Sequence, residues 1–422
     1  MNATDALYAR VSRRLVPFLF LCYVVAYLDR VNVGFAKLQM QADLALSDTI
    51  YGFGAGIFFI GYFLFEVPAN LLMTKVGARR WIARIMVSWG VISSCMLFTK
   101  DAHSFYLLRF LLGVAEAGFF PGVILYLTYW YPARRRARIV AMFMSAIAVA
   151  GVLGGPLSGW IMSTLAGHSG LTGWQWLFLL EGLPSVVVGV WALWYLDDSI
   201  RDSSWLDDDE VALLEAELAA DPEPRAQWSL RHVFGSSRVW MLCLIYFLFV
   251  MGLYGVGFWL PQLIRNAGVQ DVLNVGLLTA IPYGIAAVVM IAVARSSDRS
   301  GERRWHAAIA AFAGAAGLAV TTQVHDPVTA MVALSVATAG ILATFPVFWS
   351  LPTAMLGGTA AAAGIAMINS VGNLAGFVSP YLVGAIKDIT HSTSHGMMVL
   401  AASLLAGGVL VLACVNRQNE VL

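Results

Sequence analysis

The sequence predicts an all-α membrane protein with twelve transmembrane helices arranged as two six-helix repeats. Hydrophobic residues fill 59% of the 422 positions and charged residues only 12%, whereas soluble domains carry roughly 25% charged residues. Twelve apolar stretches are long enough to cross a bilayer, and one loop sequence occurs twice at a fixed offset. A soluble chain of this length would need a charged surface that these residues do not supply.

The twelve expected spans are each long enough for a hydrocarbon core of roughly 30 Å. Their limits are 15–36, 50–74, 82–99, 104–129, 139–165, 174–196, 239–264, 272–294, 306–322, 328–350, 359–386 and 396–415. Three arginines precede the first span, as they would in a secretory signal. However, the span runs into Tyr27-Leu28-Asp29-Arg30 and not into a small-residue cleavage site, so we expect it to be retained.

The distribution of Lys and Arg predicts the orientation of the chain. Of the 26 basic residues, 20 fall on one side, in the two termini and alternate loops, and 2 lie within spans. The 4 on the other side are Lys37, Lys100, Arg265 and Lys387. Because cytoplasmic loops carry the positive excess, we expect both termini in the cytoplasm and the protein in the cytoplasmic (inner) membrane. The net charge of +1 argues against a nucleic-acid partner.

The longest polar stretch divides the chain into two bundles. We expect an N-terminal six-helix bundle at 1–196, a cytoplasmic connector at 197–238 and a C-terminal six-helix bundle at 239–422. Within the connector, Asp207-Asp208-Asp209-Glu210 precedes an apolar run, which predicts a short surface helix with an acidic first turn.

A loop sequence is repeated between the two bundles. Thr74–Trp81 follows span two and Asp298–Trp305 follows span eight, and four positions are identical at an offset of 224 residues. Parallel repeats of this kind place a binding site between the halves, near the bilayer midplane.

The repeated loop resembles the Asp-Arg-x-Gly-x-Arg-Arg signature of the major facilitator superfamily. The match is complete from Asp298 to Arg304, but Thr74 stands where the first loop usually has Asp, which questions an Asp-dependent latch there. The resemblance covers the whole chain and implies a role for both loops in conformational change. The residues that it singles out are Gly77, Arg79, Arg80, Asp298, Arg299, Gly301 and Arg303.

Charged residues within spans are functional candidates, because each costs about 2.5–3.5 kcal/mol to insert. They are Asp29, Arg30, Glu66, Arg109, Glu116 and Glu181. All seven histidines fall in or beside loops, so any proton transfer would have to use carboxylates. The four cysteines show no metal or disulfide spacing, and we expect no metal site and no cofactor.

Helix geometry relates the depths of these charges. Asp29 lies about 21 Å from the cytoplasmic start of span one, and Arg109 about 7.5 Å into span four from the other side, so the two can pair. Glu116 follows Arg109 by two turns on the same face, near the midplane. A static ion-pair cluster joining spans one and four is the alternative, but buried ion pairs are weak evidence for stabilisation, which favours function.

Three motifs resemble the anion:cation symporter family of that superfamily. They are Tyr27-Leu-Asp-Arg-Val-Asn32, Arg109-Phe-Leu-Leu-Gly-Val-Ala-Glu-Ala-Gly118 and Glu181-Gly-Leu-Pro184. Its members are generally proton-coupled carriers of organic anions such as sugar acids, tartrate, phthalate and hydroxyphenylacetate. Glu66-Val-Pro-Ala-Asn70 is similar to the tartrate and phthalate type.

The resemblance implies a division of roles among the buried charges. Arg30 would hold the substrate carboxylate, Asp29 and Glu116 would carry protons, and Arg109 would move between them. A planar guanidinium suits bidentate carboxylate recognition, and a buried carboxyl can change its protonation as its surroundings change.

Other side chains are candidates for lining the pocket. They are Tyr27 and Tyr62 in the first half, and Trp349, Ser350, Asn369 and Asn373 in the second. The resemblance places an aromatic residue and an Asn of the second half in the substrate site. Packing roles stay open for Tyr27 and Trp349, helix–helix bonding for Asn373, and structural roles for Glu66 and Glu181.

These features predict a secondary active transporter and not an enzyme. We expect proton-coupled uptake of a small organic carboxylate by alternating access, by a monomer in the lipid bilayer. An anion exchanger or uniporter stays open, because Gly151–Gly159 resembles a motif of antiporters, although close helix packing also explains a glycine-rich span. A membrane sensor that binds the anion without moving it is a further alternative, but the chain shows no sizeable soluble output domain.

Overall fold

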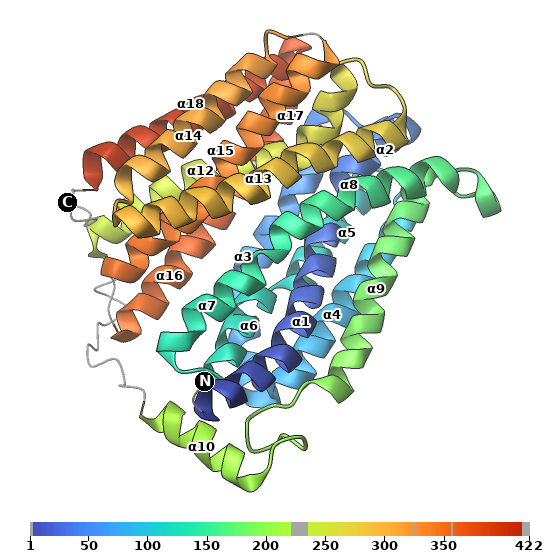
Figure 1. Cartoon of the computed structure of the whole chain (residues 1–422). Helices are drawn as coiled ribbons and strands as arrows, with labels where there is room; N and C mark the ends of the chain where they lie inside the picture. The colour runs from blue at the N-terminus through green and yellow to red at the C-terminus, as the bar shows by residue number, and fades with distance from the viewer. Residues whose placement is uncertain (1–2, 221–234, 325, 356–357, 416–422) are drawn as a thin grey trace.

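The computed structural model describes residues 3–220, 235–324, 326–355 and 358–415. Part of the expected connector and Arg417 lie outside these ranges. The described chain folds into helices joined by short turns (Figure 1), which confirms the all-α prediction. The first half contains α1 (Ala3–Val31), α2 (Val33–Asp43), α3 (Asp48–Val76), α4 (Ala78–Cys95), α5 (Ala102–Glu116), α6 (Phe119–Thr128), α7 (Ala133–Met144), α8 (Ala146–Thr164) and α9 (Gly173–Tyr195).

The second half follows a connector that includes α10 (Asp208–Ala219). It contains α12 (Ser237–Asn266), α13 (Val272–Ser300), α14 (Arg304–Thr321), α15 (Pro327–Met355), α16 (Gly358–Asn373), α17 (Ala375–Thr390) and α18 (Thr393–Cys414). Within the described residues, ten helical segments are long and apolar enough to cross a membrane. Expected spans nine and eleven, which correspond to α14 and to α16 with α17, are not among these ten.

Four of the expected spans are not single helices. Spans one, four, five and eleven are each formed by two consecutive helices. The break in span four is sharp, because Gly118 has φ +85°. Residues with a side chain rarely adopt this left-handed backbone conformation, whereas glycine does so readily. Gly118 therefore ends the helix that precedes it. Glu116 therefore becomes the last residue of α5.

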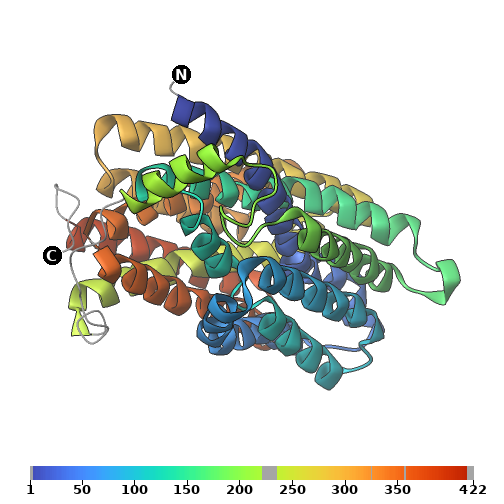
Figure 2. The same cartoon turned by 90° about the horizontal axis from the view of Figure 1, so that it is seen from below.

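Polar side chains stand at the beginning of several helices. Ser47, Asp101, Asp207 and Asp271 each precede a helix and accept a hydrogen bond from a backbone N–H of its first turn. Asp207 caps α10, so the short helix with an acidic first turn is present as predicted. Figure 2 shows α10 lying beside the start of α1, where Glu210 forms an ion pair with Arg10.

We call the end of the bundle at which α3 and α13 begin the distal end, because it lies opposite the chain termini. Here α3 packs on α17 and α8 packs on α13, and the two halves lie further apart toward the termini (Figure 1). The backbones approach very closely: a Cβ added to Gly155 of α8 would lie 2.5 Å from the carbonyl oxygen of Gly276 in α13. Only glycine fits this contact between the halves.

Charged side chains reinforce the contact at the distal end. Asp48, at the start of α3, binds Lys37 of α2 at 2.6 Å and Lys387 of α17 at 2.9 Å. Asp388 of α17 accepts hydrogen bonds from the backbone N–H groups of Asp48 and Thr49, at 3.1 and 2.8 Å. We call Lys37, Asp48, Lys387 and Asp388 the distal charge cluster.

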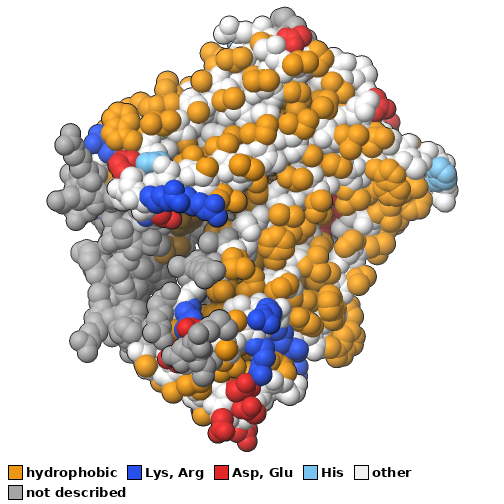
Figure 3. Space-filling model, in the orientation of Figure 1, with side chains coloured by type: hydrophobic (Ala, Val, Ile, Leu, Met, Phe, Trp, Pro, Cys, Tyr) orange, Lys and Arg blue, Asp and Glu red, His pale blue; other side chains and the backbone are white. Residues whose placement is uncertain are grey.

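The outer surface fits a membrane protein. In the space-filling view, apolar side chains cover the faces of the long helices, and charged side chains gather near α10 and near the end of α13 (Figure 3). Among the exposed apolar residues are Trp194, Val288 and Val328, each about two-thirds exposed or more. Such a surface is stable where lipid covers it.

The glycine contact between the halves gives a first prediction. Gly155→Leu should destabilise the state in which α8 and α13 are in contact at the distal end. Overpacking of such a tight contact typically costs about 1–3 kcal/mol of conformational stability. We expect at least a roughly tenfold fall in transport in proteoliposomes, with a folded protein by circular dichroism. Gly284→Ala is the matched control, since its added Cβ meets only Val152, at 4.0 Å. Equal transport by Gly155→Leu and wild type would contradict the prediction.

Candidate functional site

The centre of the molecule holds a buried ion pair. Arg30, in the last turn of α1, donates through Nη2 to the carboxylate of Glu116 and through Nη1 to the Tyr254 hydroxyl, at 3.1 Å. Tyr254 belongs to α12, so Arg30 joins the two halves. Its Nε makes no hydrogen bond within the described chain. The guanidinium therefore keeps a donor for another acceptor.

Aromatic side chains enclose this guanidinium. The rings of Phe58 and Tyr62 in α3 each lie 5.5 Å from its Cζ, a distance at which cation–π attraction operates. Tyr27, one turn before Arg30, is buried, and its hydroxyl has no partner among the described residues. The structure thus brings together three of the residues predicted for the substrate site, with unused donors on Arg30 and Tyr27.

Asp29 lies in a different environment from Glu116. Its carboxylate accepts hydrogen bonds from Trp89 at 3.0 Å, Ser93 at 2.7 Å and Ser185 at 2.5 Å. These donors come from α4 and α9, inside the first half. No ion pair to Asp29 occurs in the described part of the chain. Neutral donors alone hold this carboxyl in place.

The expected pairing of Asp29 with Arg109 does not occur. Arg109 donates to the backbone carbonyls of Gly54 and Ala55 in α3, at 3.4 and 2.9 Å. Successive residues on a helix point about 100° apart, so Asp29 faces α4 and α9 while Arg30 faces the centre. Similar depth in the membrane was therefore not sufficient to predict contact.

The second half contributes Asn369 and an aromatic cluster. Asn369 and Ser370 of α16 donate to the two carboxylate oxygens of Glu66 in α3, at 3.5 and 2.8 Å. Glu66 of α3 thus forms a second polar link between the two halves. Trp349 packs edge-on against Tyr246 of α12, with ring centroids 4.9 Å apart.

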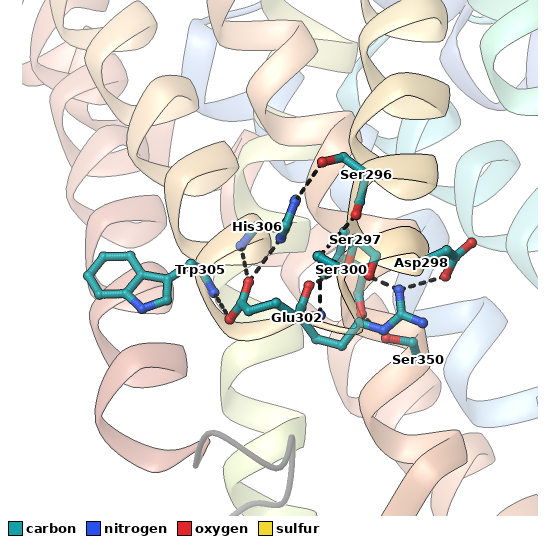
Figure 4. A network of polar contacts seen from close by, with 10 residues as sticks. Ser296, Ser297, Asp298, Ser300, Glu302, Trp305, His306 and Ser350 are labelled. Atoms are coloured by element: carbon teal, nitrogen blue, oxygen red, sulfur yellow. Dashed lines mark hydrogen bonds and ion pairs between the residues drawn. The ribbon is translucent and has the colours of Figure 1, made fainter.

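Ser350 lies outside the candidate pocket. Figure 4 places it beside the Asp298 loop, and its hydroxyl donates to the carbonyl of Val347 at 2.6 Å. Tyr254, Ser370, Ser93 and Ser185 were not singled out from the sequence. Hydroxyl residues are frequent in such helices, and nothing in their spacing separates these from the others.

The Asp298 loop is an internally bonded turn. Arg303 binds the Asp298 carboxylate at 2.6 Å and the Ser297 hydroxyl at 3.0 Å, while Gly301 takes a φ of +68° (Figure 4). Glu302 accepts from the backbone N–H of Trp305 at 2.7 Å and contacts the His306 ring at 2.9 Å. Burial raises the pKa of Glu302, but these hydrogen bonds outweigh it and hold the pKa below its usual value. This helix cap is therefore present at neutral pH and is lost as the pH falls through that lowered pKa.

The first loop replaces its missing Asp with a distant carboxylate. Asp198, just after α9, accepts from the backbone N–H of Arg79 at 2.8 Å and lies 3.8 Å from its Nε. Gly77, with φ +94°, permits the turn between α3 and α4. Arg80 and Arg299, the remaining loop residues, are exposed. Asp198 therefore caps α4 where Thr74 cannot form an ion pair.

The Asp198 cap yields a second prediction. Asp198→Asn weakens the contacts to Arg79, and loss of a helix cap typically costs about 0.5–2 kcal/mol. We expect a lower melting temperature and slower transport. Adding Thr74→Asp should restore part of both by supplying a carboxylate to the same loop. Asp202→Asn, at an exposed position that bonds Ser199 at 2.7 Å, is the control. A melting temperature and a transport rate of Asp198→Asn equal to those of wild type would contradict the capping role of Asp198.

Comparisons with known proteins agree on one assignment. The sequence pattern of the Major Facilitator Superfamily matches residues 19–380. The chain is 48% identical over 415 residues to the "Putative metabolite transport protein NicT" of Pseudomonas putida, covering 98% of this chain and 95% of that protein. It is 49% identical over 415 residues to a "Putative tartrate transporter" of Agrobacterium vitis, covering 97% and 95%.

A solved structure supports the fold. The crystal structure of a D-xylose-proton symporter superposes with a TM-score of 0.77 at 18% identity, covering 98% of this chain and 99% of that chain. At this level of identity the likeness concerns the architecture alone.

Proposed function

Since the chain belongs to the major facilitator superfamily, whose members are transporters and not enzymes, we propose that it takes up a small organic carboxylate together with protons. The observation that carries the proposal is the buried pair of Arg30 and Glu116, in contact with Tyr254 of the second half. We further propose that it works as a monomer in the cytoplasmic (inner) membrane with both termini in the cytoplasm, as the distribution of basic residues favours.

The pair supplies a way to link an anion to a proton. An unpaired guanidinium is costly in apolar surroundings, so Arg30 needs a negative partner. While Glu116 is ionised, it fills that role. When Glu116 takes up a proton, the partner is lost, and a substrate carboxylate can bind the same guanidinium through two parallel hydrogen bonds. Proton and anion then enter the site together.

The surrounding side chains suit a small, partly polar anion. Tyr27 and Arg30 hold unused donors, Tyr62 supplies a ring, and Asn369 and Glu66 place an amide and a carboxylate nearby. The donors of Arg30, Tyr27 and Asn369 would bind carboxylate oxygens, and the Glu66 carboxylate would accept a hydrogen bond from a substrate hydroxyl. The relative whose name cites tartrate, a hydroxy acid, supports this substrate class. Asp29 is the second proposed proton carrier, inside the first half.

Transport would follow from the contacts between the halves. Tyr254 and Glu66 connect the site to α12 and α16, so protonation of Glu116, which changes the partner of Arg30, would affect the contacts between the halves. Rocking of the halves around this centre would expose it to either side in turn. An anion exchanger or uniporter on the same fold would bind substrate at Arg30 without needing proton uptake at Glu116.

A third prediction concerns substrate binding. Arg30→Lys should weaken the affinity for a carboxylate such as tartrate by about tenfold to a hundredfold, because an ammonium cannot form the bidentate contact. Isothermal titration of purified protein measures it. Arg84→Lys, whose guanidinium packs on the Trp81 ring 3.9 Å away, is a matched control outside the site. Unchanged affinity in Arg30→Lys would reject the role of Arg30.

A fourth prediction separates symport from exchange. Glu116→Gln keeps the size of the side chain but cannot change its charge. In proteoliposomes we expect exchange of labelled for unlabelled substrate to persist, while accumulation driven by an imposed pH gradient is lost. Accumulation equal to that of wild type would remove Glu116 as the coupling residue. Wild-type exchange without any response to the pH gradient would favour the exchanger.

A further inference from the structure

Glu181 is a buried carboxyl that the proposed cycle does not use. It lies in α9 and is 3% exposed. Its Oε1 accepts a hydrogen bond from the Ser158 hydroxyl of α8 at 2.8 Å. Its Oε2 is buried and has no partner within the described residues. A buried oxygen of this kind normally has a hydrogen-bond partner.

Asn32 is an equally unsatisfied neighbour. It lies between α1 and α2, is 1% exposed, and its amide is close enough to Glu181 to act as a hydrogen-bonding neighbour of the carboxyl. Neither its amide oxygen nor its amide nitrogen makes a hydrogen bond of good geometry to described residues. Glu181 and Asn32 therefore hold three buried polar atoms, Oε2 and the two amide atoms, without a well-formed hydrogen bond.

The charged surroundings favour a neutral Glu181. Asp29 of α1 is the titratable group that acts on it, and it carries the same charge. The neighbouring Ser158 of α8 is neutral, and no ion pair to Glu181 occurs in the described chain. Asp29 has three well-formed hydrogen bonds from neutral donors, whereas Glu181 has one, from Ser158, beside the Asn32 amide. Of the two carboxyls, Glu181 is the one whose ionised form is poorly stabilised.

A small cavity adjoins this group between the two halves. Its volume is about 20 Å³, enough for one water molecule. Asn32 and Ser158 line it from the first half, and Thr279 and Tyr283 line it from the second. Gly155, at the tight contact with α13, forms part of the same wall. Separation of α8 from α13 would therefore open this cavity.

We propose that Glu181 is a further proton-carrying residue, protonated while the distal ends are closed. While the distal ends are closed, the Oε2–H group donates a hydrogen bond to the Asn32 amide oxygen or to a water in the cavity. The proton is taken up earlier, while α13 lies away from α8: a hydronium ion from the distal side gives its proton to the ionised carboxylate, leaving the acid and a water molecule. The proton returns to water when the site opens to the opposite side, which leaves the carboxylate ionised and a hydronium ion. Ser158 orients the carboxyl and Asn32 orients the water. This inference rests on the proposed proton-coupled transport.

The test uses two readouts, one of which does not depend on transport. Infrared spectroscopy of the purified full-length protein at neutral pH should show a protonated-carboxyl band that Glu181→Gln lacks. Ser158→Ala should shift this band, because it removes the hydroxyl that bonds Oε1. Ser335→Ala is the matched control: its hydroxyl is also buried, but it bonds the carbonyl of Met331 in its own helix at 2.7 Å, so the band should be unchanged.

The second readout is coupling in proteoliposomes. For Glu181→Gln we expect exchange of labelled tartrate to persist and the number of protons entering per substrate, measured with a pH-sensitive dye, to fall relative to wild type. A band that persists in Glu181→Gln, or an unchanged proton-to-substrate ratio, would overturn the inference. If a sodium gradient drove accumulation of tartrate by wild type, and Glu181→Gln lost this accumulation, the inference would also be overturned, in favour of a cation site at Glu181. If wild type itself ignores the pH gradient, the proposed function fails, and the infrared band alone decides the state of Glu181.

Discussion

The organisation of the site depends on one requirement, that the cation of Arg30 must have a negative partner. Electrostatic interactions are strong where water is excluded, so a lone guanidinium between the two halves would be severely destabilising. The α5 helix ends at Glu116, which brings its carboxylate to that cation. Phe58 and Tyr62 add their ring faces, and Tyr254 adds a hydroxyl from the other half.

The buried carboxyls of the first half differ in the partners that surround them. Glu116 faces a full cation, Asp29 faces three neutral donors, and Glu181 faces one donor and an unsatisfied amide. Their ionised forms are therefore stabilised to different degrees. In the proposed cycle, movement of the halves would change the surroundings of Glu116 and Glu181, whereas the hydrogen-bond donors of Asp29 all belong to the first half.

The sequence predicted the fold far better than the contacts within the site. Apolar length, basic loops and the repeated turn were sufficient for an all-helical membrane protein, and the short connector helix with its acidic first turn was predicted as well. Arg30, Glu116 and Tyr62 were each singled out as candidates, but their contact joins α1, α3 and α5 and was not predicted. The successful predictions depend on composition and on local sequence.

The predictions that were wrong or missing concern which helix a side chain faces, and a single sequence does not determine this. Asp29 and Arg109 lie at similar depths but point toward different helices, so the expected pair is absent. Asp198 replaces the carboxylate missing at Thr74, although 119 residues separate it from Arg79. The link from Glu66 to Ser370 joins two halves whose relative placement is set by packing. The glycine contacts at the distal end had a ready explanation in helix packing, but the partner helix could not be named.

Three of the four basic residues assigned to the distal side turn out to join the halves. Lys37 and Lys387 bind Asp48, and Arg265 donates to the carbonyl of Leu38 at 2.7 Å. Lys37 also lies 3.3 Å from the centre of the Trp259 ring. Opening of the distal end must return these cations to water. Closure at this end thus combines the glycine contact of α8 with α13 and a buried polar contact, and dissolved salt screens the attraction of these charges far less than it would on an exposed surface.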